Sequence, residues 1–113
     1  MFNLIEDFYR SILGLSKLER LDEHVDFKKL IEEGATLLDV RRDEEYEMGH
    51  IENAIHIPVE ELKSRLAEIE AANLPILVYC RSGRRSGKAK KILNKAGLLT
   101  FNAGGYKYLS KKI

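Results

Sequence analysis

Apolar residues occur along this chain in two patterns, short continuous runs and longer stretches at helical spacing. Continuous runs of about five residues favour buried strands, whereas apolar positions three or four residues apart favour amphipathic helices. The short runs predict strands at 36–40, 54–57, 75–79 and 99–101. The helical pattern predicts helices over 3–15, 22–33, 43–48 and 59–71, a helix that follows a polar loop at 80–86 and ends at Ala96, and a short terminal helix.

Strands that alternate with helices indicate βαβ units. We therefore predict an α/β fold with a mainly parallel central sheet and helices on both faces. Asp22 is a candidate N-cap for the helix ending near Glu33, since aspartate caps helices well. We expect a domain over 20–113 and an amphipathic helical extension over 1–19. That helix could pack on the domain, or dock on a partner or a second copy.

Composition favours a single globular domain: 113 residues, of which 44% are hydrophobic and 33% charged. The net charge of +1, with mixed signs throughout, gives no global attraction to nucleic acid. No apolar stretch approaches the length of about 20 residues that spans a bilayer. The first residues carry acids where a secretory signal carries bases. We therefore expect a cytoplasmic protein with no nucleic-acid or membrane partner.

The single cysteine, Cys80, excludes an intramolecular disulfide and a site built from several thiolates. The three histidines show no metal-ligand spacing beside it, so we expect no metal and no other cofactor. In parallel sheets, ligands bind outside the carboxyl ends of the strands. This rule selects the loops after Val40 and after Tyr79, and Cys80 begins the second loop.

The loop after Tyr79 has the composition of an anion-binding loop, with the residues Arg81, Ser82, Gly83, Arg84, Arg85 and Ser86. Its backbone amides, the following helix N-terminus and its arginines would all stabilise negative charge. A lone cysteine is otherwise most often a small buried apolar residue. Here the neighbouring loop favours the thiolate, which is the nucleophilic form. Lys90 and Lys91, further along the helix, are expected on a solvated face.

Several motifs, taken in order, resemble those of a known family. They are Leu38-Asp39-Val40-Arg41, Glu45-Tyr46 with Gly49-His50-Ile51, Ala54-Ile55-His56-Ile57-Pro58, Val78-Tyr79-Cys80 with the loop through Ser86, and Gly104-Gly105-Tyr106. Over about residues 20–113 the chain resembles a single-domain rhodanese of the thiosulfate sulfurtransferase type. Many relatives carry Trp where this chain has Tyr106, a change that should preserve the packing.

The resemblance implies that Cys80 attacks the outer sulfur of a donor such as thiosulfate and carries it as a persulfide. A nucleophilic acceptor, cyanide or a thiol, then takes the sulfur, and a protein could serve as donor or acceptor. Backbone amides from Arg81 to Ser86 would stabilise the anionic sulfur. Either Arg84 or Arg85 would hold the sulfonate end of the donor.

Three residues near the first strand are expected to support the site. Arg41 could contribute to the pocket rim, but an ion pair with a nearby acid such as Glu45 is at least as consistent with the sequence. Asp39 is expected to secure loop backbone, and His50 is expected to be structural.

Two other functions fit parts of the sequence. Phosphatases and arsenate reductases with related folds need Cys-x5-Arg, in which the arginine clamps a phosphoryl group. Here Ser86 occupies that position and Arg85 falls one residue early, which argues against phosphoryl chemistry. The second alternative is a regulatory or persulfide-carrier module that serves one protein partner. Retention of Cys80 and its basic loop favours the active enzyme.

Overall fold

The computed structural model describes residues 22–113, so the extension predicted over 1–19 lies outside the described residues. One sheet contains β1 (Thr36–Asp39), β2 (Ile55–His56), β3 (Ile76–Cys80) and β4 (Thr100–Gly105). Its order is β2-β1-β3-β4, and every neighbouring pair of strands is parallel. The predicted α/β fold with a parallel sheet is therefore confirmed.

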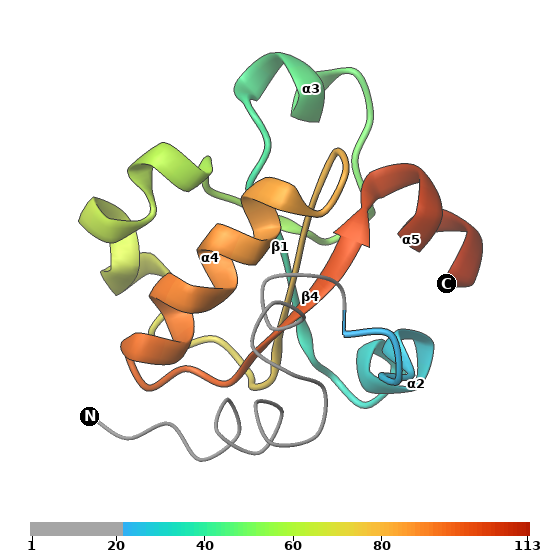
Figure 1. Ribbon diagram of the computed structural model, residues 1–113, viewed down its shortest axis with the longest axis horizontal. Helices are drawn as coiled ribbons and strands as arrows, with labels where there is room; N and C mark the ends of the chain where they lie inside the picture. The colour runs from blue at the N-terminus through green and yellow to red at the C-terminus, as the bar shows by residue number, and fades with distance from the viewer. Residues whose placement is uncertain (1–21) are drawn as a thin grey trace.

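Helical segments cover both faces of the sheet (Figure 1). They are α2 (Phe27–Glu32), α3 (Asp43–Glu47), the 3-10 turns η2 (Val59–Glu61) and η3 (Lys63–Glu68), α4 (Arg84–Lys95) and α5 (Tyr106–Lys112). Side chains alternate across a strand. Val78 and Cys80 of β3 therefore pack with α4 and the 3-10 turns, whereas Leu77 and Tyr79 pack with α2 and α5. Burial on both faces explains the continuous apolar runs of the strands.

The amphipathic stretch at 59–71 differs from the predicted helix because it forms two 3-10 segments with a break at Arg65 (φ −118°, ψ 20°). The Ser64 hydroxyl donates to the Glu61 carbonyl at 2.9 Å, and the Arg65 amide donates to Leu62 instead. Such side-chain hydrogen bonds compete with α-helical pairing. The side chains of the predicted apolar stripe still face the core: Val59, Leu62 and Ile69 are buried, and Leu66 packs against them.

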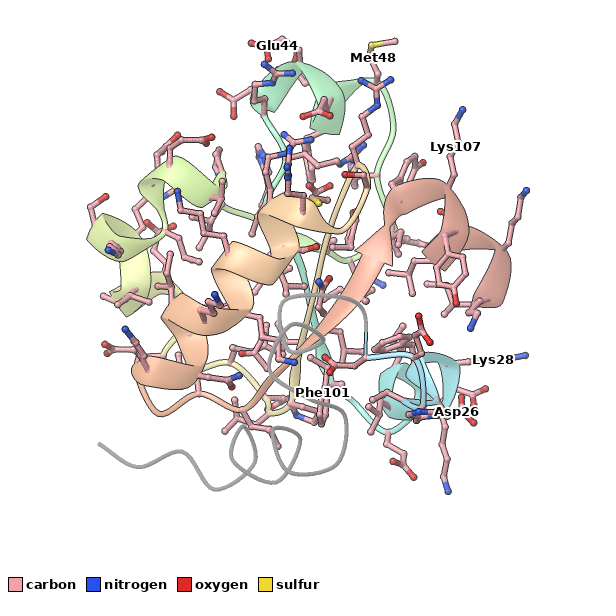
Figure 2. The ribbon with its side chains drawn as sticks, viewed as in Figure 1. Asp26, Lys28, Glu44, Met48, Phe101 and Lys107 are labelled. Atoms are coloured by element: carbon pink, nitrogen blue, oxygen red, sulfur yellow. The ribbon has the colours of Figure 1, made fainter. Side chains whose placement is uncertain are left out.

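The first described helix begins later than predicted. Asp26 caps α2 by accepting a hydrogen bond from the Lys29 amide at 3.1 Å, so the assignment of Asp22 as the cap was wrong. Figure 2 shows Asp26 and Lys28 on this helix. Asp22 instead forms a buried ion pair with Lys90, whose Nζ lies 2.8 Å from Oδ1. Lys90 is therefore not on a solvated face as predicted, because α4 turns it toward β4; Lys91 is exposed as expected.

Within residues 22–113, none of the helices has both the length and the apolar character that crossing a membrane requires.

Candidate active site

Cys80 is the last residue of β3, and its side chain is fully buried. Helix α4 begins at Arg84, so the loop is shorter than the predicted 80–86, and Arg84, Arg85 and Ser86 form the first helical turn. Gly83 caps the helix with φ 97°, a left-handed conformation that glycine adopts without steric cost. This tight turn from strand to helix places the sulfur beside the positive end of α4.

Groups of the loop and first helical turn surround the Cys80 sulfur. The Gly83 amide donates to Sγ at 3.0 Å, and the Ser86 hydroxyl lies 3.3 Å from it. Burial raises the pKa of Cys80, but hydrogen bonds from the Ser86 hydroxyl and from the amides of Ser86, Ser82 and Gly83 outweigh it. The net pKa is lowered from its ordinary value, which agrees with the thiolate expected from the loop sequence.

Arg85 is held by an acid from the neighbouring strand-end loop. Its guanidinium donates to both carboxylate oxygens of Glu45, at 2.6 and 2.9 Å. These hydrogen bonds lower the pKa of Glu45 to about 2. Glu44 of α3 and Met48, the residue that follows this helix, project outward (Figure 2). The ion pair therefore ties α3 to the first turn of α4.

Arg41 forms an ion pair with a nearby acid, as expected, but the acid is Asp39 and not the suggested Glu45. Its guanidinium forms a buried ion pair with Asp39, 2.7 Å from Oδ2, and donates to the Gly49 carbonyl at 2.6 Å. The Tyr106 ring covers the guanidinium at 4.4 Å. Asp39 also accepts a hydrogen bond from the Arg41 amide at 2.9 Å, so its predicted role of securing loop backbone is confirmed. These contacts give Arg41 a structural role on the loop that follows β1.

His50 stacks on the Tyr46 ring at a centroid distance of 3.7 Å, and its Nδ1 lies 2.9 Å from the Tyr46 carbonyl. His56 stacks on Tyr46 at 4.2 Å and contacts the Arg41 carbonyl through Nε2 at 2.8 Å. This stack holds the turn after α3 together, so the structural role predicted for His50 is confirmed. In the part of the chain that the structure describes, no group of three or more His, Cys, Asp or Glu side chains could hold a metal ion.

Asn102 is a residue of the site that the sequence reasoning missed. It lies on β4, fully buried, and its Oδ1 accepts from the Ser86 hydroxyl at 2.7 Å. Its Nδ2 donates to the Gly83 carbonyl at 3.0 Å. The predicted strand at 99–101 stopped one residue short of it. The glycine pair beyond it was the available signal, because β4 runs beside the carboxyl end of β3.

Gly105 allows β4 to approach the cysteine loop closely. A Cβ atom at this position would lie 2.5 Å from the Arg81 carbonyl oxygen and 3.5 Å from the Ser82 Cα. Both are backbone atoms, so a side chain here could be accommodated only by moving the loop. Glycine at 105 is therefore a steric requirement of the site.

Gly105→Ala should displace the loop, lower stability by about 1–3 kcal/mol and slow any reaction of Cys80 by about a hundredfold. Urea unfolding and steady-state kinetics measure the two effects. Gly97→Ala is the matched control, because Gly97 has φ 83° but open space around its Cα. It should lose stability with little change in activity. Normal activity in Gly105→Ala would show that the loop tolerates displacement.

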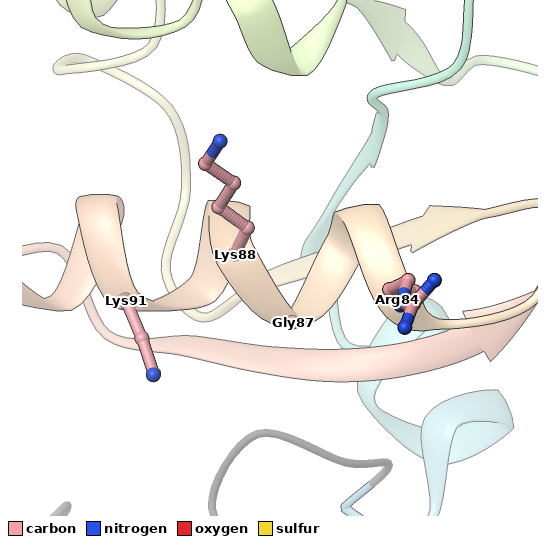
Figure 3. A pocket seen from close by; sticks show the side chains of 4 residues that line it. All are labelled: Arg84, Gly87, Lys88 and Lys91. Atoms are coloured by element: carbon pink, nitrogen blue, oxygen red, sulfur yellow. The ribbon is translucent and has the colours of Figure 1, made fainter.

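The outer face of α4 carries a shallow basic groove lined by Arg84, Gly87, Lys88 and Lys91 (Figure 3). The helix contains six Lys or Arg residues and no Asp or Glu. Two of the six, Arg85 and Lys90, are paired with the acids described above. The cations of the groove are exposed and extend along the helix from the cysteine loop. They create a positive potential beside the site.

The fold and the site define a class: an α/β protein with a buried cysteine held between a strand and a helix N-terminus. The family model for the rhodanese-like domain matches residues 23–112. The chain belongs to this family, as its motifs had indicated.

Three known proteins illustrate the similarity. Thiosulfate sulfurtransferase PspE of Escherichia coli is 44% identical over 72 residues, 62% of this chain and 69% of that protein. Putative sulfur carrier protein YrkF of Bacillus subtilis is 41% identical over 73 residues, 63% of this chain but only 39% of that protein. The solved structure "rhodanese with anions from E. coli" superposes with a TM-score of 0.60 at 43% identity, over 65% of this chain and 88% of that one. These relatives support sulfur transfer as the general activity.

Proposed function

We propose that the protein is a sulfurtransferase that moves a sulfane sulfur from a small anionic donor such as thiosulfate to cyanide or a thiol. The observation that carries this proposal is the environment of the Cys80 sulfur. The sulfur accepts a hydrogen bond from the Gly83 amide and lies beside the Ser86 hydroxyl at the start of α4. The similarity to PspE, a thiosulfate sulfurtransferase, supports the same donor. A reducing, cytoplasmic setting, which keeps a lone thiol reduced, is part of the proposal.

The reaction would proceed by covalent catalysis in two steps. The Cys80 thiolate attacks the outer sulfur of thiosulfate, a new S–S bond forms, and sulfite leaves with the electron pair of the broken bond. The terminal sulfur of the resulting persulfide is anionic, and the loop amides can stabilise it. A cyanide or thiolate acceptor then attacks that outer sulfur, and the electron pair of the cleaved S–S bond restores the Cys80 thiolate.

Between the two candidate arginines, we assign the sulfonate of the donor to Arg84. Arg85 is engaged in its bidentate ion pair with Glu45. Arg84 is exposed where the basic groove meets the cysteine loop. Its guanidinium can therefore meet an incoming anion without breaking an ion pair of the described residues. Arg85 would contribute mainly by fixing the first turn of α4.

Arg84→Glu should raise the KM for thiosulfate by about tenfold, because a charge-assisted contact becomes a repulsive one. The KM for an uncharged sulfur donor should change much less, and initial rates with both donors measure the difference. Lys95→Glu is the control, since Lys95 is exposed at the opposite end of the same helix. Equal effects on the two donors would remove the proposed sulfonate contact.

Intact mass spectrometry after incubation with thiosulfate tests the proposed function. The protein should gain the mass of one sulfur atom and lose it again on addition of a thiol or cyanide, and sulfite should appear in solution. Absence of both the added sulfur and sulfite would contradict the thiosulfate reaction. Gain of sulfur from a persulfide donor, but not from thiosulfate, would favour a carrier that serves a protein partner. The similarity to YrkF, a putative sulfur carrier protein, is the observation behind that alternative.

A phosphatase or arsenate reductase remains disfavoured. The position that carries the phosphoryl-clamping arginine in such enzymes is Ser86 here. Its hydroxyl lies between the Cys80 sulfur and the Asn102 amide oxygen, at 3.3 and 2.7 Å. Arg85 cannot replace the missing arginine while it is bound to Glu45.

A further inference from the structure

A buried chain of polar groups leads from the Cys80 sulfur into the domain. We propose that Asn102 is a positioning residue for Cys80: its side-chain amide fixes both the Ser86 hydroxyl and the Gly83 loop against the sulfur. The proposal rests on the function proposed above, since it concerns the same nucleophile. Asn102 lies on β4, and none of the hydrogen bonds described joins it directly to the sulfur.

The proposal rests on two hydrogen bonds made by one side-chain amide, that of Asn102. Asn102 Oδ1 accepts from the Ser86 hydroxyl at 2.7 Å, and Asn102 Nδ2 donates to the Gly83 carbonyl at 3.0 Å. Ser86 and Gly83 both place a hydrogen-bonding group on Sγ, at 3.3 and 3.0 Å. Cys80, Ser86 and Asn102 are all fully buried. Buried polar groups keep their hydrogen bonds, so each group in this chain constrains the next.

The Ser86 hydroxyl has a single proton. It can donate this proton to Asn102 when Cys80 is a thiol or to the sulfur when Cys80 is a thiolate. When Cys80 is a thiol, its S–H can donate to Ser86 Oγ while the hydroxyl donates to Asn102. When Cys80 is a thiolate, the hydroxyl can rotate and donate to the sulfur instead. Asn102 Oδ1 then still accepts a hydrogen bond from the Gly104 amide at 3.0 Å. Neither state leaves a buried oxygen unpaired, which would otherwise cost free energy.

The backbone of Asn102 is itself clamped. Its amide donates to Asp22 Oδ2 at 2.6 Å, and its carbonyl accepts from the Asp22 amide at 3.1 Å. Asp22 in turn is paired with Lys90 of α4, the helix that also carries Ser86. The side chain of Asn102 therefore projects from a fixed point toward the cysteine loop. A rigid support of this kind is what a reacting group requires for precise placement.

The test measures the Cys80 thiol pKa from the pH dependence of alkylation by iodoacetamide. In Asn102→Ala we expect the pKa to rise by about one unit, because the Gly83 loop loses the Nδ2 hydrogen bond that holds its amide against the sulfur. This loss should outweigh that of the acceptor for the Ser86 hydroxyl, which is used only in the thiol state. A rise of about one unit is tenfold less thiolate at a fixed pH below the pKa. Asn94→Ala is the matched control. Like Asn102, Asn94 is buried, and its side chain accepts a hydrogen bond from the Thr100 amide at 2.9 Å. It lies in the last turn of α4, away from Cys80. This control should lose stability without moving the thiol pKa.

Asn102→Asp provides a second variant of nearly the same size, should the alanine variant fail to fold. It places a carboxylate near the thiolate and loses the donor to Gly83, so the thiol pKa should rise by more than in Asn102→Ala. In the double variant Ser86→Ala/Asn102→Ala, the pKa shift should differ from the sum of the two single-variant shifts, because one residue acts partly through the other. A wild-type thiol pKa in folded Asn102→Ala and Asn102→Asp would overturn the proposal, as would a shift equal to that of Asn94→Ala.

Alkylation needs no sulfur donor, so this outcome is independent of the proposed sulfur transfer. Persulfide formation together with an unchanged thiol pKa in the Asn102 variants would refute the positioning role alone. A raised pKa in a protein that never takes up sulfur would refute the transferase function alone.

Discussion

Cys80→Ser should release no sulfite from thiosulfate and gain no sulfur in the mass spectrum. We expect the turnover to fall by at least about a thousandfold, because a serine hydroxyl stays protonated at neutral pH and is a poor nucleophile toward sulfur. The hydroxyl is smaller than the thiol but can keep the hydrogen bond from the Gly83 amide. The fold should therefore survive, and the loss should be chemical rather than structural.

Circular dichroism and urea unfolding should show a folded Cys80→Ser protein. Ser110→Ala serves as the control, because Ser110 is exposed on α5 and donates only to the Tyr106 carbonyl among the hydrogen bonds described. It should keep the activity of the parent protein. Turnover by Cys80→Ser equal to that of the parent would assign the nucleophile to another group.

Lys90→Met should produce the largest loss of stability, a decrease of about 3–5 kcal/mol in the free energy of unfolding. The Asp22 and Lys90 side chains are each only 5% exposed and lie 2.8 Å apart. Removing the ammonium leaves the carboxylate buried without its counter-ion, which is far more costly than breaking an exposed pair. Urea denaturation measures the change.

The double variant Asp22→Asn/Lys90→Met separates the lost charge balance from lost packing. An asparagine at 22 can still accept the Asn102 amide and carries no charge, so much of the stability should return. Lys88→Met, on the exposed side of the same helix, should change stability by less than about 0.5 kcal/mol. A Lys90→Met variant as stable as Lys88→Met would mean that the ion pair contributes nothing to folding.

The strands and the position of Cys80 could be predicted because they depend on local patterns. A strand buried on both faces is apolar over most of its length, and this is why 36–40 and 75–79 stand out in the sequence. The carboxyl end of the second run places Cys80 at the edge where parallel sheets bind ligands. The glycine and serines that follow then indicate a loop suited to anions.

The pairing of charges could not be predicted, because it depends on how each helix is rotated against the sheet. Glu45 binds Arg85 rather than Arg41, and Asp22 binds Lys90, 68 positions away in the chain. Helical spacing alone cannot distinguish a buried lysine with a distant partner from a solvated one. Asn102 was missed for a different reason, since an asparagine near a predicted strand end is most often part of a turn.

The full burial of Cys80 has a consequence for which bond of the proposed intermediate an acceptor can break. A persulfide contains two sulfur atoms joined at about 2.05 Å, so the added atom extends beyond the enclosed one. Attack at the inner atom would expel hydrosulfide and leave the acceptor joined to the enzyme as a mixed disulfide. Attack at the outer atom transfers sulfur and regenerates the thiolate. In such an intermediate the buried surroundings of Cys80 would shield the inner atom, so the fold would favour productive transfer over self-inactivation.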